Sequence, residues 1–333
     1  MPPRRAPTSP RLQELRELAS EPAAQAALAQ TVLATDKDVQ AIRAAVEVLK
    51  QHPTPAARRL LRDRFDHYAA DGVRRDAGTY LRATIIQALR QIALPDDLPL
   101  LERAATTYEF LPPGRSEEGS LLRSAALVTL DAVDPKLAAY HCIRLLADPY
   151  TSRLSGEPAV TAVRVLAAQG NDWPLYYYAL HQPETQSDVL SECLKNLANL
   201  PAALAAGLVD KYGASDNEVV LVGLLDMLLE AGGSPFIHEF LGRTDKYAVY
   251  HYLVTRLVAS PTPAGLAELN QQAQQERDAR KLGILEEALQ LGRADPMIQT
   301  ALAAVKRSRK AAGRAAHSET SVTREAGSTK NQG

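Results

Sequence analysis

The sequence predicts an all-α protein built from a row of stacked helical hairpins, and three observations support this prediction. Ala and Leu dominate the composition while aromatic residues make up only 5%, a balance that favours helices over strands. Apolar residues recur at helical spacing through most of the chain. Short breaks rich in Pro, Asp, Asn or Gly follow these apolar stripes at an average interval of about 35 residues.

The clearest hairpin spans Tyr80–Ala105. Its apolar stripe falls at i, i+4, i+7, i+8 and i+11 on one helix face and consists of Leu81, Ile85, Ala88, Leu89 and Ile92. The segment 94–97 then breaks the helix, and either Asp96 or Asp97 is expected to cap the next helix. Pro99 fits the first turn of that helix, where no intrahelical bond is lost. Two such helices cannot bury their own apolar face, so the hairpin needs a copy on each side.

The best second copy begins at Ser120 and repeats the stripe at a uniform offset of 41 residues, with Asp134 and Pro135 as its elbow. The repeated positions are Leu122, Ala126, Thr129, Leu130 and Val133. Eight hairpins can be aligned on the position of Leu89, which is occupied in turn by Val46, Leu89, Leu130, Leu166, Leu194, Leu225, Val254 and Leu289. The elbows that follow lie at 52–55, 94–97, 134–135, 171–174, 199–201, 232–235, 260–263 and 294–296.

These hairpins resemble the HEAT-repeat family, including its degenerate bacterial members. The resemblance rests on LRATIIQALRQIALPDDLPLLERAA and LRSAALVTLDAVDPKLAAYHCIRLLAD, and it covers roughly residues 39–305. It implies a right-handed α-solenoid of about eight HEAT-like hairpins whose second helices line a concave face. It implies no reaction, because most HEAT-like proteins are scaffolds or adaptors.

The chain is expected to contain three parts. Residues 1–35 form N-terminal capping helices, with Ser9 and Pro10 as the N-cap and first position of a helix. Residues 36–305 form the solenoid, and residues 306–333 form a basic disordered tail with a formal charge of +5. The start of this tail, KRSRK, is also compatible with an extension of the last helix, whose C-terminus favours cations. No secretory signal and no run of 18 apolar residues occurs, so we expect a cytoplasmic protein without a membrane span.

Two connections are longer than a hairpin needs: Leu111–Ser120 and Asp148–Pro158. Insertions in a solenoid emerge on one edge, often beside the binding face. A tolerated surface loop is the simpler interpretation, because a longer loop adds little closure entropy.

No catalytic arrangement stands out. Cys142 and Cys193 have no arranged base and lie in apolar helical patterns, which predicts small buried side chains. His141 and Cys142 are adjacent and therefore point about 100° apart on a helix. We expect no enzyme activity, no metal and no cofactor. Some HEAT-like proteins are alkylpurine DNA glycosylases or bilin lyase subunits, and these less favoured alternatives would make the chain an enzyme.

Arginines cluster near the N-terminus, at Arg58, Arg59, Arg62, Arg64, Arg74 and Arg75. Together with the basic tail they suggest an alternative function, a nucleic-acid-associated protein. The simpler interpretation is a solvated face crosslinked by i,i+4 ion pairs, Arg59 with Asp63 and Arg62 with Asp66.

Aromatic residues concentrate in the middle and late hairpins. Three consecutive tyrosines at 176–178 span about 200° of helical arc, so at least one ring must leave the buried stripe. We predict a partner-binding edge built by Tyr140, Tyr177, His181 and Tyr250, beside the two long connections. Residues 116–305 carry 14 basic and 23 acidic side chains, a formal charge of −9, so the expected partner is a protein whose surface is basic and partly apolar.

Overall fold

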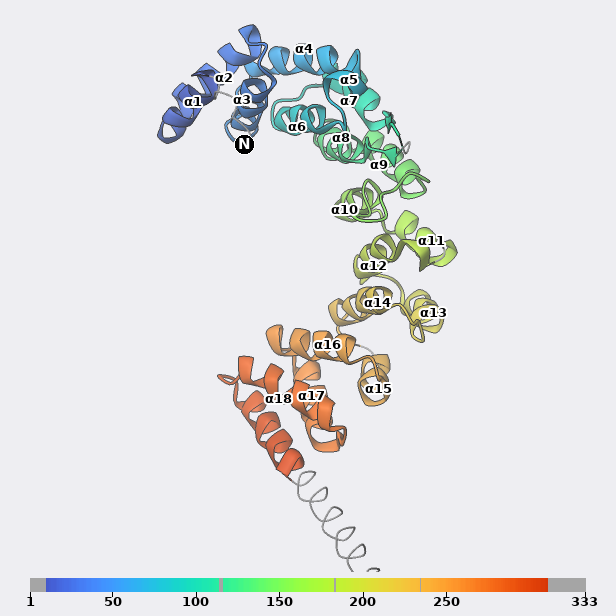
Figure 1. The fold of residues 1–333 in the computed structure, drawn as a ribbon. Coiled ribbons are helices and arrows are strands. Elements are labelled where there is room, and N and C mark those ends of the chain that lie inside the picture. Colours follow the sequence, from blue (N-terminus) through green and yellow to red (C-terminus); the bar gives the residue numbers. More distant parts are fainter. Residues whose placement is uncertain (1–9, 114–115, 183, 234, 311–333) are drawn as a thin grey trace, which may run out of the picture. The chain divides into compact units, whose positions relative to one another are not determined.

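The computed structural model describes residues 10–113, 116–182, 184–233 and 235–310, and most of these residues are helical (Figure 1). The chain divides into two compact units, residues 1–175 and 176–333. We call them the first and second unit and describe each by itself.

The first unit begins with two helices that precede the aligned hairpins. Its described elements are α1 (Pro10–Glu17), η1 (Leu18–Ser20), α2 (Pro22–Thr35), α3 (Val39–Gln51), α4 (Ala57–Ala69), α5 (Gly72–Arg75), α6 (Tyr80–Leu89), η2 (Pro95–Asp97), α7 (Leu98–Ala105), β1 (Phe110–Leu111), β2 (Ser116–Glu117), α8 (Ser120–Val133), α9 (Pro135–Leu146) and α10 (Ala159–Ala168). Pro10 opens α1 as expected, while Ser9 lies outside the described residues.

Helices α3, α6, α8 and α10 pack side by side in the first unit, and α7 and α9 cover them from outside. Figure 1 shows the α3–α10 row on the inner side of this unit's curve. Each member of that row is the first helix of its aligned hairpin. The expectation that second helices line the concave face is therefore not met in this unit.

Helix α11 (Asp172–His181) contains the boundary between the units. The second unit then contains η3 (Glu184–Gln186), α12 (Ser187–Lys195), α13 (Ala202–Tyr212), α14 (Glu218–Glu230), α15 (Pro235–Arg243), α16 (Tyr247–Ala259), α17 (Pro263–Gln275), α18 (Ala279–Leu291) and a helix over residues 296–310. Its helices α12, α14, α16 and α18 pack in sequence, each against the next.

The predicted helix–elbow–helix pattern is confirmed throughout the described chain. All eight residues aligned with Leu89 are fully buried, each on a different helix from α3 to α18. Every predicted elbow lies at a junction between two helices, but at 171–174 the prediction is shifted, because residues 172–174 already belong to the next helix, α11. The one polar member of the second stripe, Thr129, is also fully buried because its hydroxyl donates to the carbonyls of Ile86 and Ala125.

Three local expectations need correction. Asp97 does not cap α7; its carboxylate closes the elbow by accepting the Leu94 N–H at 2.8 Å. The connection expected as an irregular loop contains a short antiparallel ladder that pairs Phe110 with Glu117 and Leu111 with Ser116. Residues 306–310 continue a helix rather than begin a tail. The expected disorder of residues 311–333 lies outside the described residues.

Candidate functional site

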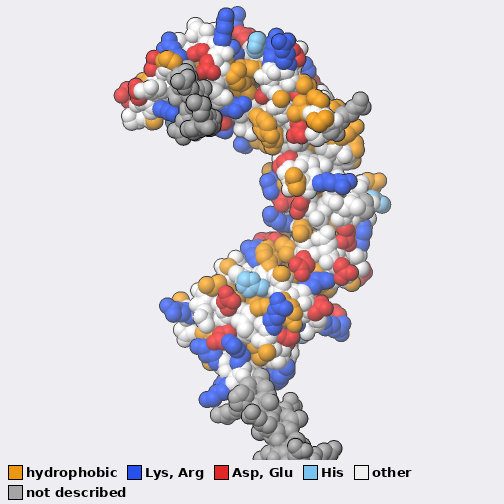
Figure 2. Space-filling model, viewed as in Figure 1, with side chains coloured by type: hydrophobic (Ala, Val, Ile, Leu, Met, Phe, Trp, Pro, Cys, Tyr) orange, Lys and Arg blue, Asp and Glu red, His pale blue; other side chains and the backbone are white. Residues whose placement is uncertain are grey.

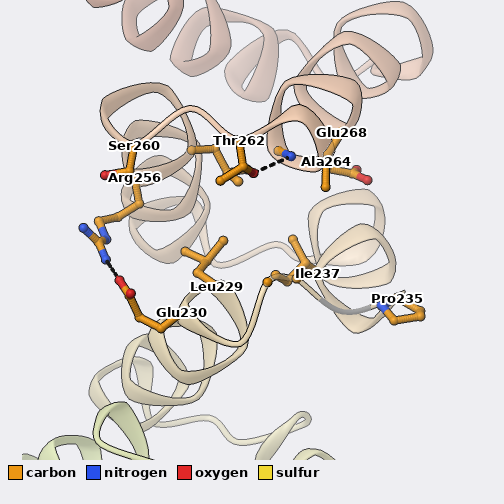
Figure 3. A pocket seen from close by; sticks show the side chains of 13 residues that line it. Leu229, Glu230, Pro235, Ile237, Arg256, Ser260, Thr262, Ala264 and Glu268 are labelled. Carbon is orange, nitrogen blue, oxygen red and sulfur yellow. Dashed lines mark hydrogen bonds and ion pairs between the residues drawn. The ribbon is translucent and has the colours of Figure 1, made fainter. Parts of the chain in front are cut away.

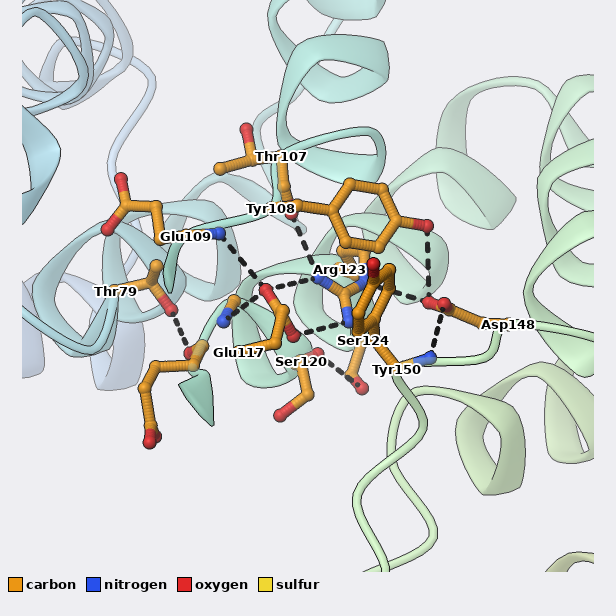
Figure 4. A network of polar contacts seen from close by, with 12 residues as sticks. Thr79, Thr107, Tyr108, Glu109, Glu117, Ser120, Arg123, Ser124, Asp148 and Tyr150 are labelled. Atoms are coloured by element: carbon orange, nitrogen blue, oxygen red, sulfur yellow. Dashed lines mark hydrogen bonds and ion pairs between the residues drawn. The ribbon is translucent and has the colours of Figure 1, made fainter. Parts of the chain in front are cut away.

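The two long connections of the first unit meet at one buried arginine, Arg123 of α8, which is fully shielded from solvent (Figure 4). Its two terminal nitrogens donate to the two carboxylate oxygens of Glu117, each at 2.8 Å. One of them also donates to the Thr107 carbonyl at 2.9 Å, and Nε lies 3.3 Å from Asp148 in an ion pair. A guanidinium suits this place because its planar fork can serve several acceptors at once.

Strand β2 positions Glu117 from the first connection. The Glu117 carboxylate accepts the backbone N–H groups of Glu109 at 3.1 Å and Gly119 at 2.8 Å, in addition to Arg123. A buried charge is tolerated only when it is paired and hydrogen-bonded, and here both conditions hold. The connection is therefore fixed to the helices below it.

Asp148 performs the same role for the second connection. Its carboxylate is fully buried and accepts the Tyr150 N–H at 3.0 Å and the Tyr108 hydroxyl at 3.2 Å. Asp148 thus connects Arg123, through an ion pair, to Tyr108 and Tyr150, through hydrogen bonds. One buried cation thereby fixes both connections.

Aromatic rings cover this ion network. The Tyr108 ring lies over the Arg123 guanidinium at 4.2 Å, and the rings of Tyr108 and Phe110 each pack edge-on against Tyr150, at 5.6 and 5.2 Å. Phe110 and Tyr150 remain 42% and 47% exposed. We call Tyr108, Phe110 and Tyr150 the aromatic platform. Figure 2 shows apolar side chains gathered over this part of the first unit.

The preceding hairpin contains an equivalent network around Arg82, which lies 41 residues before Arg123. Arg82 donates to Asp76 at 3.1 Å and to both oxygens of Glu109 at 2.6 and 2.8 Å. Burial lowers the pKa of Arg82, but its bonds to Glu109 and Asp76 outweigh burial and leave the pKa raised. Because the Glu109 N–H donates to Glu117, the two networks join into one continuous polar ladder.

Sequence reasoning missed this ladder, although its signal is present. Each arginine follows a leucine of the predicted stripe, has an acidic residue six positions earlier, and has a second one 27 or 25 positions later. We define the charge ladder by these six residues: Asp76, Arg82, Glu109, Glu117, Arg123 and Asp148.

The four residues predicted for the binding edge differ in how exposed they are. Tyr140 lies in the first unit on α9 and is 61% exposed, while Tyr177 is 67% exposed on α11. Its ring packs against that of His181, also exposed, at 4.4 Å. The exposure of Tyr177 beside the buried Tyr178 confirms that one of the three consecutive rings leaves the stripe.

The prediction that Tyr250 belongs to a binding edge is wrong, because Tyr250 is fully buried on α16. The Lys281 ammonium lies 5.1 Å from the centre of its ring, and burial raises the pKa of its hydroxyl. That hydroxyl has no hydrogen-bond partner among the described residues. Tyr250 therefore belongs to the core of the second unit.

Most of the N-terminal arginines are engaged inside the first unit. Arg58 and Arg62 both pair with the buried Asp97, at 2.6 and 3.2 Å, so the expected Arg62–Asp66 pair is replaced. Asp66 pairs with Arg103 instead. Arg59 pairs with Asp63 at 3.9 Å as predicted, and Arg64 donates to the carbonyls of Leu33 and Asp36.

The two cysteines, which are the candidate nucleophiles, are buried and poorly suited to nucleophilic attack. Both cysteines are free and fully buried, as predicted, and burial raises the pKa of Cys142 to about 12. The thiolate needed for nucleophilic attack is therefore scarce at neutral pH. Among the described residues, no group of three His, Cys, Asp or Glu could hold a metal ion. Within the same residues, no helix is long and apolar enough to cross a membrane.

Comparison with models of known protein families and with curated proteins finds no match to this chain. The HEAT-like resemblance therefore stays a prediction about ancestry, while the helical-hairpin architecture is a property of the structure.

Proposed function

We propose that this protein is a non-enzymatic interaction scaffold that binds a partner protein through the aromatic platform. One observation carries the proposal: two aromatic rings stay about half exposed although they lie above a buried ion network that fixes the backbone of both connections. A ring that served only the core would be covered by its neighbours. These rings are instead held at the surface.

The rigidity of the platform favours binding. A partner that contacts Phe110 and Tyr150 gains apolar contact area from side chains with few rotatable bonds. Glu117 and Asp148 already fix the backbone beneath both rings, so little ordering entropy is lost on association. A mobile loop of the same sequence would bind more weakly.

The partner that fits best has a basic and partly apolar surface. The charge of −9 over residues 116–305 speeds the approach of a positive surface, while burial of the exposed platform rings against the partner supplies most of the binding energy. The nucleic-acid alternative is less favoured, because Arg58, Arg62 and Arg64 are engaged with the protein itself. We also propose a cytoplasmic location, as expected from the sequence.

Capture from the native cell tests the proposal. The wild-type chain and its Phe110→Ala and Tyr150→Ala variants would be used as bait, with crosslinking to locate contacts. We expect each substitution to weaken binding of the captured partner by about 1–2 kcal/mol, roughly tenfold, while the helical circular-dichroism signal stays unchanged.

The matched control is Tyr80→Ala, because Tyr80 is an exposed aromatic residue of the same unit outside the platform. It should bind like the wild type. Equal binding by all four proteins would refute the platform as the contact site. Binding that collapses when salt is raised, and that needs residues 311–333, would favour the nucleic-acid alternative.

A further inference from the structure

The second unit contains a pocket of about 390 Å³ among four helices (Figure 3). Its walls come from the ends of α14 and α16 and from the beginnings of α15 and α17. Leu229, Ile237 and Leu257 supply apolar surface, and Thr262 caps α17 at the rim by accepting the Gly265 N–H at 3.0 Å. This volume lies within the range of sites that bind small molecules.

Two glycines in the connection from α14 to α15 leave one side of the pocket open. Gly232 and Gly233 adopt φ of 94° and 104°, a left-handed conformation that suits glycine, and their N–H groups bond back to the end of α14. A Cβ atom at either glycine would meet nothing within 4 Å. At these two glycines the chain therefore passes the pocket without a side chain to fill it.

Charges lie at opposite sides of the pocket. On one side Arg256 pairs with Glu230 at 3.0 Å and with Asp226 at 3.3 Å, so its positive charge is compensated twice. Figure 3 shows Glu268 on the other side, away from that pair. The three carboxylates of Asp226, Glu230 and Glu268 outnumber the one guanidinium of Arg256, which favours a cation.

Glu268 has room for one more donor. Its carboxylate is 15% exposed and accepts His238 Nδ1 at 2.9 Å and Gln272 Nε2 at 3.0 Å. A carboxylate offers about four acceptor positions. A donor that arrives through the pocket can therefore bond to Glu268 without displacing either neighbour.

We propose that this pocket binds a lysine side chain of the partner protein, with the ammonium on Glu268 and the four-carbon stem along Leu229, Ile237 and Leu257. The inference rests on the proposed function, because it gives the basic and partly apolar partner a point of contact. A cation with an apolar stem matches both parts of the pocket, since apolar walls lead to a carboxylate. An apolar side chain would leave Glu268 without its counter-charge.

The test uses two small probes that differ only in the charged group, N-acetyl-lysine methylamide and N-acetyl-norleucine methylamide. The full chain is labelled with ¹³C at isoleucine methyl groups, and the Ile237 signal is identified by its loss in Ile237→Val. We expect the lysine probe to shift this signal saturably, with a Kd in the millimolar range. The norleucine probe should bind about tenfold more weakly or not at all.

Variants then test whether Glu268 is the charged group that binds the lysine probe. Glu268→Gln keeps the shape of the site and should weaken the lysine probe about tenfold. The control Glu239→Gln removes an equal charge from α15 outside the pocket and should change nothing. Ala264→Leu narrows the pocket, so it should abolish the shift of the Ile237 signal while Glu268 stays intact. This variant keeps the proposal testable if Glu268→Gln folds poorly.

Three results would overturn the inference: equal shifts by both probes, no saturable shift with the lysine probe, or binding of free n-butylamine without binding of the lysine probe. The last would assign the pocket to a free amine rather than to a protein side chain. The Phe110→Ala and Tyr150→Ala variants should bind the lysine probe like the wild type. Failure of the platform and failure of the pocket are therefore distinguishable.

Discussion

Both units bury basic side chains, and two of these, Arg123 and Lys281, are satisfied in different ways. Arg123 of the first unit donates to Glu117 and the Thr107 carbonyl and pairs with Asp148. Lys281 of the second unit donates to the Leu241 carbonyl at 2.9 Å, near the end of α15, and its carboxylate partner Glu276 lies 3.8 Å away. The arginine is bound mainly by full charges, and the lysine mainly by neutral carbonyls.

The difference reflects what each cation holds together. Arg123 fixes two connections that are distant in sequence, and only a forked group reaches acceptors on both. Lys281 joins α18 to the end of α15, where carbonyl groups without helical partners already favour a cation. The ammonium group of a lysine, which acts as a point charge, is sufficient to bind these carbonyls. The two environments therefore predict different responses when the charge is removed.

The largest effect is expected at Arg123. Arg123→Met leaves the buried carboxylates of Glu117 and Asp148 without their counter-charge, so we expect a loss of about 3–5 kcal/mol in unfolding free energy. Hydrogen exchange should rise first over residues 107–119 and 148–158. Arg153→Met, an exposed change in the same connection, is the control and should stay within about 0.5 kcal/mol of the wild type.

A double variant sharpens this prediction. Glu117→Gln removes one of the two uncompensated charges, so Arg123→Met combined with Glu117→Gln should be more stable than Arg123→Met alone. If the two changes add independently, the ion network is not the source of the loss.

A smaller effect is expected at Lys281. Lys281→Met should cost about 1–3 kcal/mol, because the groups it leaves behind are mostly neutral carbonyls. Glu276 stays bonded, since its carboxylate still accepts the N–H groups of Arg277 and Asp278, each at 2.7 Å. Urea unfolding measured on both methionine variants gives the comparison directly. A loss at Lys281 as large as that at Arg123 would refute the distinction between charged and neutral acceptors.

The smallest effect concerns pH and His141 of the first unit. Burial lowers the pKa of His141 below 6.5, helped by Arg144 and opposed by Glu102. The unfolded chain then binds more protons, so this contribution to stability is complete above pH 6.5 and is lost as pH falls toward the folded-state pKa. We expect His141→Gln to lose less stability than the wild type between about pH 7 and 5. His251→Gln, an exposed change, should follow the wild-type profile, and a parallel profile for His141→Gln would contradict the assignment.

The sequence predicts helices and elbows well, because apolar periodicity and Pro, Asp or Gly breaks act locally. All eight aligned positions are buried for this reason. The aromatic platform could not be predicted in the same way. Phe110 and Tyr150 are 40 positions apart, and they meet where Arg123 pairs with Glu117, six positions before it, and with Asp148, 25 positions after it.

Tyr250 shows the opposite error, because the sequence predicts it on a binding edge and the structure buries it. Its neighbours Tyr247 and Tyr252 are partly exposed and donate to Asp278 and Asp226, whereas Tyr250 falls on the buried side of the same helix. Tyrosine occurs in both environments, so residue type alone could not decide between them. Tyr140 and Tyr177 are exposed as predicted, and their part in binding stays a prediction.

The charge ladder has a consequence for how such an array grows. A segment of 41 residues separates Arg82 from Arg123, and each arginine takes one acidic partner from six positions before it and another from the following connection. A duplication of this length therefore copies an arginine together with both of its counter-ions. The new copy would contain both ion-pair partners of its arginine from the start, with a formal charge of −1, and the buried arginine would need no compensating mutation elsewhere.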